Sequence, residues 1–258
     1  LGVPLYYAIL AISQNPPEDS VFDGTFDYTF DETIPPADIL KAAEPVICLK
    51  AYLSGIPFLD VVQTPNGFAV VNNTNHAPAS KERVERLLEF VKRRLTAALD
   101  FLIEFAFSYS IFRGLWKQEE ELFNRHTEIV YLTTNELRRY SANQSATCMD
   151  LFTIHPVVLS LQSEIAGYFS AAYLDELIEK RRNVKLSVFD SHVFRAIQTI
   201  AGLKLQKASF YHLVESEVNY MIGHPDEYPA YMASAEYKLK MSQKYENRQR
   251  HATFFFGG

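Results

Sequence analysis

The clearest pattern in the sequence is a periodic one that follows Ser80. Apolar residues recur there at alternating steps of four and three: Val84, Leu88, Val91, Leu95, Ala98, Leu102 and Phe105. This spacing places them along one side of an α-helix, and Lys and Arg residues lie on the opposite side. Ser80 is a favourable N-cap residue. The pattern therefore predicts a long amphipathic helix from Ser80 to about Ala106.

Other stretches are also typical of helices. In the helix predicted over residues 37–53, we expect Pro45 to produce a kink. Pro156 suits the first turn of a helix, so a helix is predicted to begin there. Residues 122–132 fit either a helix or a strand. The predicted helices cover residues 37–53, 133–141, 156–182, 187–222 and 230–248.

One segment has the alternation of a β-hairpin instead. Leu59–Gln63 and Phe68–Val71 are β-prone runs, and Thr64-Pro65-Asn66-Gly67 separates them. Asn-Gly between two such runs is typical of a tight turn, because both residues tolerate positive φ. We therefore expect a hairpin over residues 57–72 with Asn66 and Gly67 at its tip.

Together these elements predict a mainly α fold: a helical bundle with an inserted β-hairpin and extended terminal arms. The length of 258 residues suits a single large domain, which we place at residues 1–248. Residues 13–36 form an acidic irregular insertion within it. Residues 249–258 form a C-terminal arm.

The distribution of charge adds an asymmetry to this picture. Residues 1–45 contain eight acidic side chains against Lys41 alone, whereas the whole chain has a net charge of −6. An overall acidic chain lacks the basic footprint of a nucleic-acid-binding protein. The acidic start and the basic residues near the C-terminus would permit head-to-tail contacts between copies, or they are ordinary solvated surface charge.

Several classes of protein do not fit the sequence. Cys48 and Cys148 lie too far apart for a zinc motif and are too few for a disulfide framework. No apolar run reaches the length of a membrane span, and Leu5–Ile12 is too short for a signal peptide. Because the first residue is Leu, we expect further residues before it.

We find no motif that indicates catalysis. The pair His212 and Glu215 could supply only two metal ligands, and a helix-surface ion pair explains it as well. Cys148 precedes His155 by seven residues, but a Cys–His dyad is a spatial arrangement that spacing does not establish. Phosphate-binding glycine motifs and the nucleophile elbow are absent. We therefore predict no enzyme activity, no catalytic residue, no metal site and no cofactor.

Two groups of residues instead indicate contacts with partners. The first is the hairpin tip, and the second is the C-terminal sequence Phe-Phe-Phe-Gly-Gly, because three exposed phenylalanines are unfavourable in water. The predicted partner-binding residues are Asn66, Gly67, Phe68, Phe254, Phe255 and Phe256.

Five stretches resemble an uncharacterised family of tailed-phage and prophage proteins encoded among head and tail genes. They are residues 59–71, 77–84, 98–104, 151–156 and 197–208. The strings Asn-Gly-Phe and Ala-Pro-Ala-Ser-Lys-Glu are the most specific of them.

The opening sequence, residues 1–7, also resembles the helix-turn-helix start of head–tail connector (adaptor) proteins. This resemblance implies a virion structural protein, assembled in the host cytoplasm and located at the head–tail junction. It implies a homo-oligomeric ring, often of twelve copies, that binds the portal protein and the neck or tail proteins. DNA would pass through the ring without specific binding. Two alternatives remain open: a non-viral helical interaction module, and an enzyme on a helical bundle with His155 or His212 in a polar pocket.

The C-terminal sequence generates the first prediction. Deleting residues 252–258 should leave a monomer that folds and melts normally but no longer joins the ring or the portal, because the three phenylalanines dock on a neighbour. Thermal unfolding and assembly assays measure the two effects. A large loss of monomer stability would instead place these phenylalanines in the domain's own core.

Overall fold

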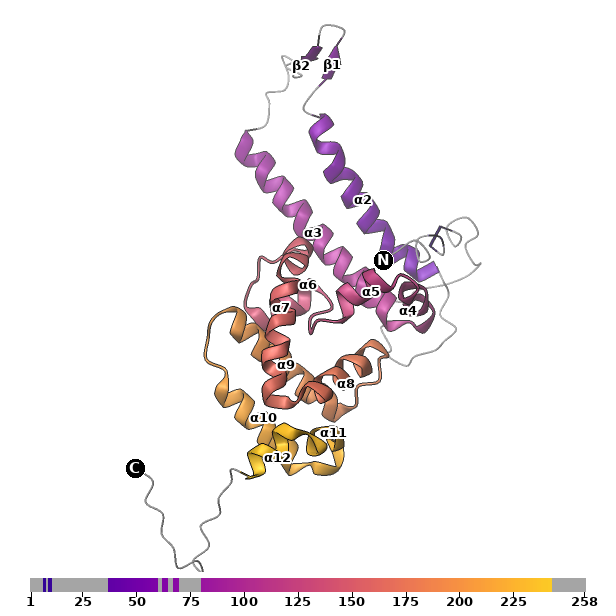
Figure 1. The fold of residues 1–258 in the computed structure, drawn as a ribbon. Coiled ribbons are helices and arrows are strands. Elements are labelled where there is room, and N and C mark those ends of the chain that lie inside the picture. The colour runs from indigo at the N-terminus through magenta and orange to yellow at the C-terminus, as the bar shows by residue number, and fades with distance from the viewer. Residues whose placement is uncertain are drawn as a thin grey trace, which may run out of the picture. The chain divides into compact units, whose positions relative to one another are not determined.

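The chain is helical almost throughout the part that the structure, a computed structural model, describes (Figure 1). This confirms the predicted all-α class. The described residues are 7, 9–10, 37–59, 62–64, 67–69 and 80–242. The chain forms two compact units, Leu1–Val157 and Val158–Gly258. Sequence analysis predicts a single domain over residues 1–248. The difference arises because the boundary falls within a continuous helix, where no change of composition marks it.

The first unit contains a long helical hairpin, which we call the arm. Helix α2 (Ala37–Leu59) packs along helix α3 (Lys81–Ser108), and the start of α2 meets the end of α3 (Figure 1). The two helices are therefore antiparallel. The predicted seam of α3 faces this contact, because Val91, Leu95 and Leu102 are buried. Helix α2 continues through Pro45 and extends six residues beyond the predicted end at residue 53.

Two short strands lie between these helices. Strand β1 (Val62–Thr64) pairs with strand β2 (Gly67–Ala69) in antiparallel register, with Gln63 opposite Phe68. The pairing is narrower than the predicted span of residues 57–72. Gly67 is the first residue of β2, opposite Thr64, and Asn66 lies outside the described residues.

A sharp turn joins the arm to the rest of the first unit. Helix α4 (Ser110–Lys117) follows α3 after the extended residue Tyr109, and the two helix axes meet at 99°. The Arg113 guanidinium donates to the carbonyl of Phe107 at 2.7 Å and so satisfies one free carbonyl at the end of α3. Most of residues 108–116, where sequence analysis predicts no helix, are thus helical. The core beneath it contains Ile103, Phe107, Trp116, Phe123 and Leu132.

Helices α5 and α6 complete the surroundings of this core. Helix α5 (Glu120–Thr127) includes the first part of residues 122–132, whose pattern fits either a helix or a strand. These residues are therefore helical up to Thr127. Helix α6 (Thr134–Ser141) begins one residue after the predicted start and ends at the predicted residue, and its N-cap residue Thr133 accepts the backbone N–H of Glu136 at 3.4 Å. The Glu136 carboxylate accepts the N–H of Leu132 rather than that of the N-cap residue.

The prediction that a helix begins at Pro156 is wrong. Helix α7 (Cys148–Phe169) contains this proline in its interior. The helix begins earlier because Asp150 accepts both the N–H and the hydroxyl of Thr147, which fixes the first turn. A break at Ser170, whose φ is +89°, separates α7 from helix α8 (Ala171–Arg182).

The long helix predicted over residues 187–222 is divided in two. Helix α9 (Val188–Leu205) ends at a turn in which Lys207 has φ +56°, and helix α10 (Tyr211–Gly223) follows. The last predicted helix is also divided, by Ser234. Its parts are α11 (Pro229–Ala233) and α12 (Ala235–Ser242), preceded by a 3-10 turn at Pro225–Glu227.

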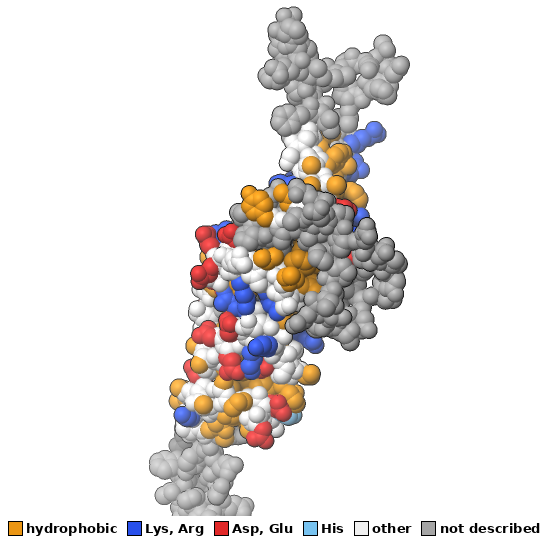
Figure 2. Space-filling view, turned by 90° about the vertical axis from the view of Figure 1, so that its right-hand side faces the viewer, with side chains coloured by type: hydrophobic (Ala, Val, Ile, Leu, Met, Phe, Trp, Pro, Cys, Tyr) orange, Lys and Arg blue, Asp and Glu red, His pale blue; other side chains and the backbone are white. Residues whose placement is uncertain are grey.

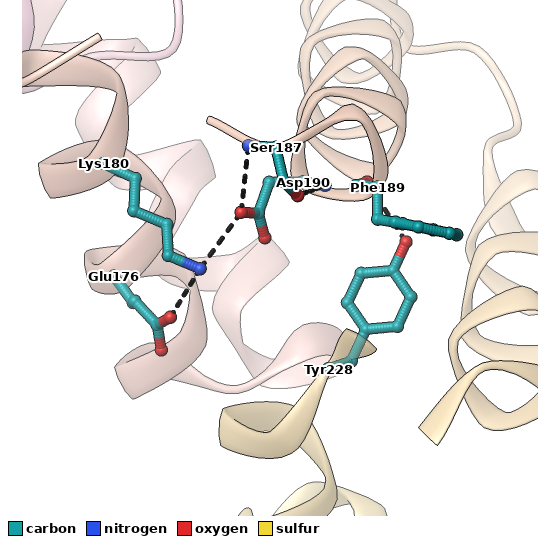
Figure 3. Close-up of polar contacts among 6 residues, drawn as sticks. All are labelled: Glu176, Lys180, Ser187, Phe189, Asp190 and Tyr228. Carbon is teal, nitrogen blue, oxygen red and sulfur yellow. Dashed lines mark hydrogen bonds and ion pairs between the residues drawn. The ribbon is translucent and has the colours of Figure 1, made fainter. Parts of the chain in front are cut away.

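A cluster of polar contacts fixes the start of α9 (Figure 3). Ser187 and Asp190 form a reciprocal capping box, and the Asp190 carboxylate lies 3.0 Å from the Lys180 ammonium. Lys180 also contacts Glu176 at 2.7 Å. Burial lowers the pKa of Lys180, but the two carboxylates outweigh it and the net pKa is raised. Close by, the Tyr228 hydroxyl donates to the carbonyl of Phe189 at 3.1 Å.

This cluster generates the second prediction. The variant Asp190→Ala loses its carboxylate's half of the capping box and the ion pair with Lys180 together, and its free energy of unfolding should fall by about 2–4 kcal/mol. Urea denaturation of the full chain measures the change. The control Glu176→Gln removes only the more exposed ion pair and should cost less than about 1 kcal/mol. Equal losses in the two variants would contradict the assignment of Asp190 as the anchor.

Candidate functional site: the exposed face of the arm

Beyond its base, the arm exposes large apolar side chains. Ile39, Ala42 and Ala43 in the first turns of α2 are buried, whereas the later residue Tyr52 is 44% exposed. On α3, Phe90 is 61% exposed and Leu87 43%. Figure 2 shows hydrophobic and basic side chains next to one another on the arm, below the grey residues at its end. Each helix thus buries one side against the other and leaves the rest uncovered.

Helical geometry assigns these side chains to faces of the arm. At about 100° per residue, Phe90, Ala97 and Phe101 lie roughly 90–130° to one side of the α3 seam, and Leu87 lies roughly 50° to the same side. On α2, Tyr52 has the same rotational offset from that helix's own half-buried row of Val46, Leu49 and Leu53. Because the helices are antiparallel, equal offsets lead to the same side of the hairpin. Tyr52, Leu87, Phe90, Ala97 and Phe101 therefore share one surface, which we call the arm face.

The arm face is basic as well as apolar. Arg83 and Arg94 lie within about 40° of Phe90 around the axis of α3, so the α3 row over residues 83–101 reads Arg, Leu, Phe, Arg, Ala, Phe and contains no acidic residue. Two other basic residues of this helix have acidic partners one turn away, in the pairs Lys81–Glu85 and Arg93–Glu89. Among the described residues, no carboxylate lies within ion-pair distance of Arg83 or Arg94. The arm face is thus suited to an acidic, aromatic partner.

Two of the six residues predicted to bind partners lie in the segment that joins the two helices of the arm. Gly67 and Phe68 belong to β2, in the segment that joins the far ends of α2 and α3 (Figure 1). Asn66 and the three phenylalanines 254–256 lie outside the described residues. Sequence analysis missed the arm face itself, although the exposed row is visible as a second periodic set beside the seam.

A buried polar network holds α6 against α3. The Asp100 carboxylate accepts the backbone N–H of Thr134 at 2.8 Å, and Glu104 accepts the hydroxyl of Thr133 at 3.2 Å. Burial raises the pKa of Asp100, against the hydrogen bonds from Thr134 and the positive charge of Arg138. Burial also raises the pKa of Glu104. Asp100 thus satisfies a free N–H group at the start of α6 and Glu104 holds the hydroxyl of its N-cap residue, so their role is to position that helix.

His126 and His155, the histidines that the structure describes in the first unit, have structural surroundings. His155 Nε2 lies 2.9 Å from a Glu128 carboxylate oxygen. Burial lowers the pKa of His126 to about 4, and its ring packs edge-on between Trp116 and Phe152. His126 is therefore neutral at physiological pH and behaves as part of the core.

Cys148 and His155, whose spacing alone does not establish a dyad, are not assembled as an activated nucleophile. Seven residues along one helix separate the two by about 10 Å along its axis, and His155 instead contacts Glu128. Burial raises the pKa of the Cys148 thiol, which disfavours the reactive thiolate.

One histidine–carboxylate pair lies among residues 158–242 of the second unit. His192 Nε2 lies 3.1 Å from Glu217, and burial raises the pKa of this carboxyl group against the opposing effect of His192. His212 and Glu215 are both exposed on α10. Across the described ranges, no three His, Cys, Asp or Glu side chains are grouped closely enough to hold a metal ion.

Comparison with known proteins gives one match. The profile of a family of unknown function (DUF6712) matches residues 1–121, which include the whole arm and α4. No curated protein and no solved structure matches the chain. Within the part of the chain that the structure describes, no single helix is long and apolar enough to cross a membrane. Only α3 together with α4 meets that criterion, and the pair is sharply bent.

The polar network generates the third prediction. The folded chain holds the proton of Asp100 more tightly than the unfolded chain, whose value is near 3.8. The contribution of this group to stability therefore falls as pH rises from about 4 through its raised pKa. Asp100→Asn removes the titration, and its amide oxygen can still accept from Thr134.

Urea denaturation between pH 4 and 7 tests this expectation. The stability of the wild type should decrease relative to that of Asp100→Asn as the pH rises. The exposed residue Asp175 provides a matched control, because Asp175→Asn makes the same chemical change outside the buried network. A wild-type advantage over Asp100→Asn that grows with pH would contradict the prediction.

Proposed function

We propose that this chain is a virion structural protein and forms the subunit of a head–tail connector ring. The observation that supports the proposal most strongly is the arm face, where apolar and basic side chains of two helices lie uncovered in the single chain. Exposed apolar surface with basic neighbours is typical of protein-binding sites. The resemblance of residues 59–71 and 77–84 to tailed-phage proteins directs the proposal towards a virion.

In this proposal each part of the chain has an assembly role. The helices of the compact units form the wall of a ring, for which we propose twelve copies. The inserted β-hairpin, residues 57–72, and the terminal arms contact the portal and the neck or tail proteins. DNA passes through the channel without specific binding, which agrees with the net charge of −6.

A non-viral helical interaction module is the alternative that the same face would serve. It differs from the connector in its assembly, because a module binds its partner as a single copy. The two functions are therefore separated by stoichiometry.

The fourth prediction is a ring. Size-exclusion chromatography with light scattering should give a mass near twelve times 29.5 kDa, either for the chain alone or after mixing with the portal protein encoded in the same genome. Negative-stain images should show annular particles with a central opening. A chain that remains a monomer at high concentration and in the presence of that portal protein would reject the connector.

A further inference from the structure

The sequence contains a segment whose chemistry is complementary to the arm face. Residues 18–32 include six acidic side chains and no Lys or Arg. Four aromatic residues, Phe22, Phe26, Tyr28 and Phe30, are interleaved with them. Acidic and aromatic side chains in one short segment are what a row of arginine, phenylalanine and leucine would select.

We propose that residues 18–32 of one copy dock on the arm face of a second copy. The arginines of the face, Arg83 and Arg94, would meet the carboxylates, and Phe90 would meet the aromatic rings. The inference rests on the proposed ring, because it supplies the contact between neighbouring subunits. The inference adds which two surfaces form that contact, namely residues 18–32 and the arm face.

The choice of a second copy follows from exposure and from symmetry. In the single chain Phe90 remains 61% exposed and Tyr52 44%. The docked segment and the receiving face are different parts of the chain, so the contact is head-to-tail. Contacts of this kind close into rings when the rotation between subunits fits a whole number of copies. A self-complementary contact would stop at a dimer.

The size of the contact is also adequate. Each aromatic side chain can bury about 150–250 Å², so the four rings of residues 18–32 correspond to roughly 600–1,000 Å². A standard stable interface buries about 800 Å² on each partner. The contact is therefore large enough to persist, and its charge pairs should make association weaker at high salt.

Photo-crosslinking in the full chain tests the proposal directly. The photoreactive residue p-benzoylphenylalanine replaces Phe90, and chains labelled with ¹⁵N are mixed with unlabelled chains before irradiation. Mass spectrometry should then show crosslinks from position 90 to residues 18–32 that join a labelled to an unlabelled chain. Crosslinks to residues 18–32 within one chain, or crosslinks only to other segments, would overturn it.

Charge reversal supplies a second measurement with a matched control. Arg94→Glu should weaken self-association at least about tenfold, because it places like charges together. Lys92→Glu makes the same change on the opposite side of the arm and should leave association unaltered. Both residues are exposed, so both variants should melt like the wild type. Equal effects of the two variants on association would overturn the proposal.

These outcomes separate the contact from the function. Intermolecular crosslinks to residues 18–32 in an open oligomer would support the contact and reject the ring. A closed ring whose crosslinks from position 90 avoid residues 18–32 would support the ring and overturn the contact.

Discussion

The seam between α2 and α3 is the contact on which the arm depends. A helix has several sides, and two helices packed together cover only one side of each. At the base, α4 covers further surface with Phe112, so residues such as Ile39 and Leu102 become buried. Farther along, nothing among the described helices takes that place. The arm has exposed residues because the contact between α2 and α3 continues beyond the part that α4 covers.

Because two packed helices cover only one side of each other, polar groups along the arm have different surroundings from polar groups in the compact parts. Where helices are surrounded, polar groups are enclosed and must be satisfied internally, as Asp100 and Thr134 are. Along the arm, Arg83 and Arg94 remain in solvent at little cost and stay available to a partner. The proposed interaction site therefore lies where the described helices leave large apolar side chains exposed.

Local rules predicted some elements and missed others. The periodic row after Ser80 and the pair Ser187–Asp190 specify helices through contacts within a few residues, and both helices begin where the sequence indicates. The helix start predicted at Pro156 is wrong because the prediction weighs only the hydrogen bond that a proline removes from a helix. The burial of Leu151 and Val158 on either side of Pro156 favours a continuous helix, and that burial depends on tertiary packing. The breaks at Ser170 and Lys207 depend on positive φ in non-glycine residues, for which the sequence has no marker.

The candidate surface was harder to predict than the helices. The hairpin sequence drew attention to residues 66–68, but the arm face combines residues more than thirty positions apart on α2 and α3. Only the antiparallel packing shows that Tyr52 and Phe90 lie on one side. The buried carboxylates were missed for a similar reason, since the contact between Asp100 and Thr134 spans 34 positions.

Trp116, the single tryptophan of the chain, is fully buried in the core of the first unit, against Phe123 and His126. Intrinsic tryptophan emission consequently reports on residues 1–157 alone, while far-ultraviolet circular dichroism averages over the helices of both units. Melting curves from the two spectroscopies coincide if the units unfold as one cooperative block and diverge if they unfold in succession. The sequence thus provides a built-in optical label for one half of the molecule, without any chemical modification.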